Sequence, residues 1–245
     1  MKKIVFFFLI MLFSIHSWSQ DNCSLGDEQY NNENYKTAIR SFQLCLKNNP
    51  KNQNAQYNLG KSYAKLENWE KASDVYERLV QNYPNNAEYN FLYGGSLGLY
   101  AKNLNPLKAV NYISDIKFYL KKAIELDANH IDARWALVQI YMELPFVVGG
   151  SKSTAEKYAE ELLEISPIDG HLAFGFIEAY DENWSDAEKH YKKAVEVGQS
   201  ETAFQKLIDV QLQQNKIEEV KTTLRKAYKI TQKEQFKKKL EELRS

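Results

Sequence analysis

The sequence repeats one pattern of residue types with a period of about 34 residues, and this period constrains the fold more than any other feature. In the clearest unit, two amphipathic helices follow one another, and Pro84 ends the second. The repeated positions are Tyr57, Leu59, Gly60 and Tyr63 in the first helix and Trp69, Ala72, Tyr76 and Leu79 in the second. A short helix pair cannot bury its apolar face alone, so such pairs stack on one another. The pattern therefore predicts an all-α chain of stacked helix pairs.

The pattern recurs along almost the whole chain, although several units are irregular. A shift of about 34 residues toward the N-terminus lands on Leu25, Gly26, Tyr35, Ala38, Phe42, Cys45 and Pro50. Beyond Gly94 the next second-helix residues, Leu120 and Ala123, arrive late, which predicts an insertion near residues 101–117. Extra residues also interrupt the fourth unit around Pro145 to Gly150. We expect about six units within residues 20–245, with a C-terminal cap helix at about 232–244.

These residue types and spacings resemble the tetratricopeptide-repeat (TPR) family over nearly all of the chain after residue 19. The resemblance implies a right-handed superhelical solenoid of antiparallel helix pairs. The insertion in the third repeat and the Pro-x-x-x-Gly-Gly joint at Pro145 to Gly150 are similar to a group of exported bacterial repeat proteins. That second likeness implies no activity.

The N-terminus has the organisation of a secretory signal peptide. Lys2 and Lys3 precede the apolar run Ile4 to Phe13, which is shorter than the roughly 20 residues needed to span a bilayer. A small-x-small arrangement predicts cleavage after Ser19, so the mature chain begins at Gln20. We expect residues 1–19 to be the signal peptide and the protein to be periplasmic or secreted, the alternative being an uncleaved anchor.

The charge balance gives no general reason to bind nucleic acid, because Lys plus Arg and Asp plus Glu each number 32. The stretch from Lys216 to Ser245 is locally basic. We interpret it as a solvated helix face; an acidic partner or a membrane surface is the alternative. We expect no stable membrane insertion once the signal peptide is removed.

Few side chains that could support catalysis or metal binding occur at suitable spacings. His130, His171 and His190 have neither cysteines nor paired carboxylates at ligand spacing, so we expect surface or structural histidines. The Gly149 to Thr154 segment lacks the upstream glycine and the Gly-Lys-Ser/Thr order of a phosphate loop. The sequence predicts no enzyme activity, cofactor or metal.

A helix cap explains the same glycine-rich segment better than a phosphate site. We expect the two glycines to make a turn, Ser153 to cap the following helix, and Glu156 to complete a capping box.

The chain has two cysteines, Cys23 and Cys45, and both belong to the predicted mature protein. If the first two helices are antiparallel with a turn near Asn32 to Asn34, the two cysteines lie about level. Whether they form a disulfide depends on both side chains pointing inward, and the sequence leaves this open.

We expect a binding surface in the concave groove lined by the first helices of successive repeats. The candidate partner-binding residues are Asn54, Tyr57, Asn58, Lys61, Phe91, Trp135 and Gln139. In the second unit these residues face away from the packed Leu59, Gly60 and Tyr63. The aromatic rings would stack on an extended peptide, the asparagines would bond its backbone, and Lys61 would attract a carboxylate. The alternative is that Tyr57, Phe91 and Trp135 are consensus residues of the repeat.

The predicted function is therefore an exported scaffold that binds a protein or peptide in the cell envelope. Two other functions stay open. One is a structural subunit or homodimer of an envelope assembly, and the other is an enzyme or small-ligand receptor that uses the insertion near 101–117.

Overall fold

The structure is a computed structural model that describes residues 22–243, and within this range it is helical with no strand. The predicted signal peptide lies outside the described residues. Residues 22–31 are helical. The helices that follow are α2 (Tyr35–Asn48), α3 (Gln53–Lys65), α4 (Trp69–Asn82), α5 (Ala87–Lys102), α6 (Pro106–Ala109), η1 (Val110–Tyr112), α7 (Ile113–Leu126), α8 (Ile131–Glu143), η2 (Phe146–Val148), α9 (Lys152–Ile165), α10 (Pro167–Tyr180), α11 (Trp184–Gly198), α12 (Glu201–Gln213), α13 (Ile217–Thr231) and α14 (Glu234–Glu242).

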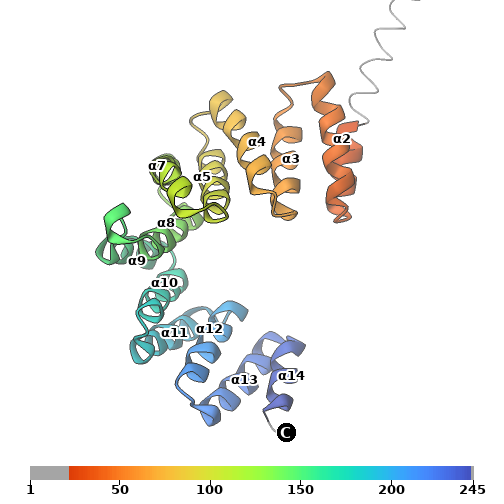
Figure 1. The fold of residues 1–245 in the computed structure, drawn as a ribbon. Coiled ribbons are helices and arrows are strands. Elements are labelled where there is room, and N and C mark those ends of the chain that lie inside the picture. Colours follow the sequence, from red (N-terminus) through yellow and green to blue (C-terminus); the bar gives the residue numbers. More distant parts are fainter. Residues whose placement is uncertain (1–21, 244–245) are drawn as a thin grey trace, which may run out of the picture. The chain divides into compact units, whose positions relative to one another are not determined.

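The described chain divides into two compact units, before and after the Ala128–Asn129 bond. In the first unit α2, α3, α4 and α5 each pack on the next helix, and α5 packs on α7. In the second unit the helices from α8 to α14 also pack in chain order, and α10 additionally contacts α8 and α12 (Figure 1). Each unit is therefore a stack of helix pairs, as the period predicts.

Four helix pairs are joined by a tight turn with a left-handed residue. Glu33, Glu67, Glu182 and Asn215 have φ values of 60°, 55°, 59° and 58°. The first two of these stand one repeat period apart, directly before Asn34 and Asn68. A left-handed residue reverses the chain within a few residues, which brings the second helix back against the first.

The two helices of a pair approach closely where the first carries a glycine. A Cβ atom at Gly60 would overlap the ring of Tyr76, whose side chain is 1% exposed. Gly26 and Gly175 have the same relation to Phe42 and Tyr191. The glycine at the helix crossing thus makes room for a large aromatic ring from the second helix.

The predicted insertion lengthens the third pair without breaking its packing. Residues 101–117 form the end of α5, then α6 and η1, and the start of α7. Gly94 of α5 faces Leu120 of α7, and Leu120 and Ala123 are fully buried. Leu107 of α6 is 87% exposed. The late second-helix residues therefore occupy the core positions that the period assigns to them.

The joint at Pro145 to Gly150 is a compact turn. Gly149 has a φ of 90°, and a Cβ atom at Gly150 would overlap the carbonyl group of Leu144. Both positions require glycine for this reason.

The predicted cap of the following helix is wrong by two residues. Ser151, not Ser153, is the cap, and its Oγ accepts a hydrogen bond from the Thr154 backbone N–H at 3.2 Å. Ser151 has the extended backbone that a cap requires, whereas Ser153 already lies in the first turn of α9. Thr154 therefore stands where the predicted box needed Glu156.

A disulfide joins Cys23, in helical residues 22–31, to Cys45 of α2, with a Cα–Cα distance of 5.1 Å. Asn52, the cap of α3, donates a hydrogen bond to Cys23 Sγ at 3.6 Å. The bridge therefore fastens the first helix of the described chain to α2, the other helix of its pair, and the Asn52 hydrogen bond links it to α3.

The disulfide predicts that the unreduced, unfolded protein has no thiol that reacts with a labelling reagent. The bridge spans 22 residues of sequence. Reduction should lower the free energy of unfolding by about 3 kcal/mol, because the open chain gains conformational entropy. A Cys23→Ser/Cys45→Ser variant should be insensitive to reductant. Two labelled thiols before reduction would contradict the bridge.

Candidate partner-binding surface

Three tyrosines and one lysine from three successive first helices form a continuous surface in the first unit. Lys61 Nζ lies 5.2 Å from the ring centroid of Tyr30 and 5.2 Å from that of Tyr57. The Tyr57 and Tyr89 rings lie 6.0 Å apart. Tyr30, Tyr57 and Lys61 are half-buried, and Tyr89 is nearly covered. We call Tyr30, Tyr57, Tyr89 and Lys61 the tyrosine face.

The helical periodicity of α3 explains why two of these side chains point the same way. Tyr57 and Lys61 are four residues apart, so they lie on one side of the helix. Leu59, Gly60 and Tyr63 are buried on the packed side. Tyr30 and Tyr89 reach the same surface from helical residues 22–31 and from α5.

Polar groups surround the tyrosine face. Asn58 Nδ2 donates a 2.7 Å hydrogen bond to Asp27 Oδ1, and Gln53 Nε2 donates a 2.6 Å hydrogen bond to the Tyr89 hydroxyl. Burial raises the pKa of Tyr57, the Lys61 cation opposes this rise, and the Glu88 carboxylate adds to it. Carboxylates from two helices thus act on this surface.

A buried hydroxyl group lies close to the tyrosine face. Tyr76 of α4 runs beneath Gly60, is 1% exposed, and has a hydroxyl group with no hydrogen-bond partner. Burial raises the pKa of Tyr76 far above its ordinary value, and the nearby Tyr57, Tyr30 and Glu88 raise it further. A buried hydroxyl group without a hydrogen-bond partner is uncommon in folded proteins.

The structure brings some of the predicted binding residues together on α3 and places others on α5 and α8. Tyr57, Asn58 and Lys61 share one side of α3 with the exposed Asn54. Phe91 is half-buried next to Gly95 on α5.

Two other predicted residues, Trp135 and Gln139, belong to α8 of the second unit. Trp135 Nε1 donates a hydrogen bond to Asp169 at 3.1 Å, and the ring packs against the core of that unit. Gln139 is exposed. Trp135 therefore has a structural role in addition to any binding role.

Asp27, Tyr30 and Tyr89 were not among the binding residues predicted from the sequence. A signal for the first two was present, because Asp27 stands one period before Lys61 and Tyr30 follows it by one helical turn. Tyr89 is buried on the packed side of α5, and only the contact of its ring with Tyr57 links it to the surface.

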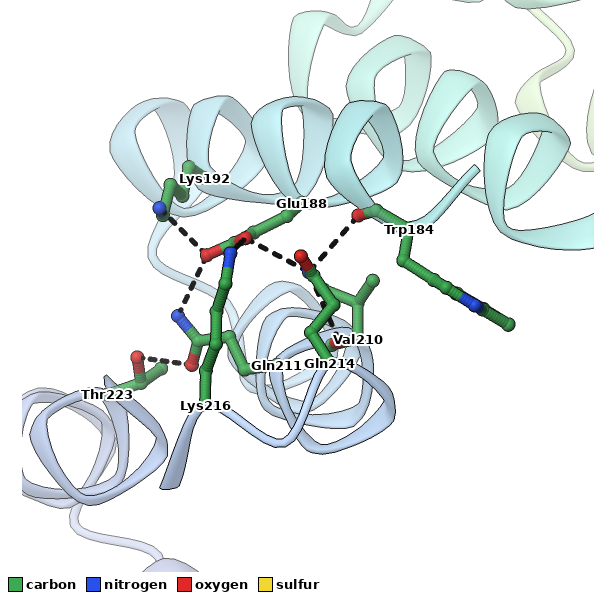
Figure 2. A network of polar contacts seen from close by, with 8 residues as sticks. All are labelled: Trp184, Glu188, Lys192, Val210, Gln211, Gln214, Lys216 and Thr223. Atoms are coloured by element: carbon green, nitrogen blue, oxygen red, sulfur yellow. Dashed lines mark hydrogen bonds and ion pairs between the residues drawn. The ribbon is translucent and has the colours of Figure 1, made fainter. Parts of the chain in front are cut away.

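A second cluster of polar side chains surrounds Glu188 of α11, which is 3% exposed (Figure 2). Its carboxylate contacts Lys192 Nζ at 2.8 Å and Lys216 Nζ at 2.6 Å. It also accepts hydrogen bonds from Gln214 at 3.0 Å and from Gln211 at 3.4 Å. Residues on or beside α11, α12 and α13 therefore share one buried charge.

This cluster links neighbouring helices, and its carboxylate is a poor base. Burial opposes ionisation of Glu188, but the bonds from Lys192, Lys216, Gln214 and Gln211 outweigh it and lower the pKa to about 2. Gln211 also accepts a 2.9 Å hydrogen bond from Thr223 of α13. A carboxylate this acidic and fully bonded stays ionised and is a poor base at neutral pH.

The histidines on α10 and α11 face each other, with His171 and His190 ring centroids 5.7 Å apart. Neither Nδ1 atom has a hydrogen-bond partner, and burial lowers the pKa of both rings. Within residues 22–243 no group of three histidine, cysteine or carboxylate side chains could hold a metal ion. His130, by contrast, caps α8, because its Nδ1 accepts a hydrogen bond from the Ala133 N–H at 3.3 Å.

The fold and this surface define a solenoid of helix pairs of the tetratricopeptide type. Residues 23–87 match the sequence profile of the tetratricopeptide repeat. Beyond these residues, the described chain is similar in fold to solved TPR proteins.

Solved structures with similar folds share little sequence with this chain. A thermophilic TPR protein of Thermus thermophilus is 18% identical with a TM-score of 0.62, covering 79% of this chain and 99% of its own. PilW, a type IV pilus biogenesis factor, is 17% identical with a TM-score of 0.63, covering 93% and 98%. YrrB, a TPR protein with an unusual peptide-binding site, is 19% identical with a TM-score of 0.53, covering 74% and 87%. No curated protein sequence matches.

No helix within residues 22–243 combines the length and apolar character needed to cross a membrane.

The Glu188 cluster predicts a specific dependence of stability on pH. The pKa falls from an ordinary 4.5 to about 2 in the folded protein, so the stabilisation is present above pH 4.5 and is lost as the pH approaches 2. It amounts to about 3 kcal/mol at neutral pH. Glu188→Gln should remove most of it and flatten this part of the pH profile, measured by urea unfolding.

Glu218→Gln is the matched control, because Glu218 forms an ion pair with Lys221 but its side chain is 80% exposed. The control should change the unfolding midpoint little. Equal effects of the two substitutions would show that the buried cluster does not tie the helices together.

Proposed function

We propose that the protein is an exported scaffold that binds a protein or peptide partner in the cell envelope, through the face formed by its first helices. The observation that carries the proposal is the tyrosine face, to which three first helices contribute aromatic rings and in which Lys61 lies over two of the rings. Aromatic rings of this kind dominate the energetics of protein interfaces because they bury a large area at a small entropic cost.

The surroundings of the tyrosine face suit an extended peptide. Asn54 and Asn58 stand one helical turn apart beside Tyr57, and their amides can exchange hydrogen bonds with a peptide backbone. YrrB, whose fold is similar, has an unusual peptide-binding site, and PilW is a pilus biogenesis factor. A scaffold of this kind needs neither a cofactor nor catalytic groups, and we propose none.

Export rests on two observations that support each other. The first is the signal-peptide pattern of residues 1–19. The second is the bond between Cys23 and Cys45, because disulfides persist in oxidising compartments such as the periplasm. We propose a periplasmic or secreted location.

A structural role in an envelope assembly is the second candidate. It is favoured by the exposed apolar side chains of the third pair, where Leu107 is 87%, Val110 45% and Phe118 58% exposed. Such side chains are covered when subunits associate.

The binding proposal predicts that Tyr57→Ala weakens partner capture while the protein stays helical. Truncating an anchor ring typically costs about 2 kcal/mol, which corresponds to well over tenfold in affinity. The measurement is capture from envelope extract by purified wild type and variant, followed by titration of each captured protein. Adding Trp135→Ala tests whether the second unit contributes.

Phe118→Ala is the control, since it removes an exposed aromatic ring from α7, a second helix of the same unit. Partners should be retained by this control and lost by Tyr57→Ala. The opposite result would move the site to the third pair and favour the assembly role.

The export proposal predicts that the envelope form of the protein begins at Gln20, with cyclised glutamine as an acceptable variant. Mass analysis of the N-terminal peptide measures this directly. Recovery of a chain that begins at Met1 would contradict cleavage and remove the basis for a periplasmic location.

A further inference from the structure

We propose that Tyr30 and Tyr57 form a cage for a lysine side chain of the partner, and that Lys61 fills this cage as a plug in the free protein. The inference rests on the proposed function, because it names the chemistry that the partner presents to the same surface. It concerns a cation site, whereas the sequence-based expectation was that Lys61 attracts a carboxylate.

The geometry of the cage comes from two different helices. Tyr57 and Lys61 lie on α3, while Tyr30 lies in helical residues 22–31. The Lys61 ammonium lies 5.2 Å from both ring centroids, within the roughly 6 Å over which an aromatic face attracts a cation. The position between the rings is therefore already shaped for an ammonium group, and in the free protein the chain supplies its own.

The charges around the cage favour a cationic occupant over an anionic one. Asp27 and Glu88 are exposed carboxylates near the rings, and Asp27 is held by its hydrogen bond from Asn58. Lys61 is the cation that lies between the rings. These carboxylates and the electron-rich ring faces attract a lysine and repel a carboxylate.

In the free protein Lys61 occupies the position that a partner lysine would take. A partner lysine exchanges one cation–aromatic contact for another, so wild-type affinity for an isolated lysine is low. Removing the charge of Lys61 while keeping an unbranched apolar side chain should therefore open the cage to an external ammonium.

The test uses a blocked peptide, Gly-Ser-Gly-Lys-Gly-Ser-Gly, and the same peptide with Glu in place of Lys. Each is titrated into full-length mature protein with ¹³C-labelled tyrosine rings, and ring signals are followed by NMR. Lys61→Met should bind the lysine peptide about tenfold more tightly than wild type does, with no gain for the glutamate peptide. Tyr30→Leu added to Lys61→Met should abolish the gain.

Lys61→Gln provides a second uncharged variant if Lys61→Met unfolds, with circular dichroism as the check of folding. Free butylammonium should bind more weakly than the peptide; equal binding would point to a small amine instead of a protein segment and would overturn the proposal. The proposal is also overturned if neither uncharged variant gains affinity for the lysine peptide, or if the glutamate peptide gains as much.

The cage and the proposed function can fail separately. If Tyr57→Ala loses the captured partner but Lys61→Met shows no gain for lysine, the surface binds by other chemistry. If Tyr57→Ala retains every partner while Lys61→Met binds the lysine peptide, the cage exists but the partner binds elsewhere.

Discussion

The close crossing of the two helices within each pair is the constraint on which the rest of the structure depends. At Gly60 the absence of a side chain lets the Tyr76 ring pack directly against α3, and the same relation joins Gly26 to Phe42 and Gly175 to Tyr191. Each crossing buries a large ring in the space that a Cβ atom would fill. It also fixes which side of the first helix remains outside the pair. The outward side of α3 carries Tyr57 and Lys61, so the candidate surface is a direct consequence of the packing beneath it.

The first unit connects this packing to its surface through the N-terminal helix. The disulfide between Cys23 and Cys45 and the hydrogen bond from Asn58 to Asp27 hold residues 22–31 against the following pairs. Tyr30 belongs to that helix, so its position beside Lys61 depends on both contacts. An exported protein can keep such a bridge because its compartment is oxidising. The proposed compartment and the proposed binding site are thus linked through one helix.

In the second unit a buried carboxylate with its polar partners links consecutive helices. The buried Glu188 carboxylate bonds two lysines and two glutamine amides, so one charge connects three consecutive helices. A buried ion is tolerated only when its partners replace the lost water, and here all of them come from within the stack. His171 and His190 face each other in the same unit without a bonded Nδ1 atom, which makes this contact sensitive to protonation.

The sequence by itself determined the helix pairs and the packed side of α3, where Leu59, Gly60 and Tyr63 are buried. These features follow from local periodicity, which repeats along the chain and needs no knowledge of neighbouring helices. Only the tertiary structure decided that Tyr30 joins Tyr57 around Lys61, that the two cysteines meet, and that Ser151 caps α9. It also placed Trp135 in the second unit, where its indole N–H donates a hydrogen bond to Asp169. Such outcomes depend on ångström-scale distances between side chains of different helices. A repeat period gives the order of those helices, but it does not give the contacts between their surfaces.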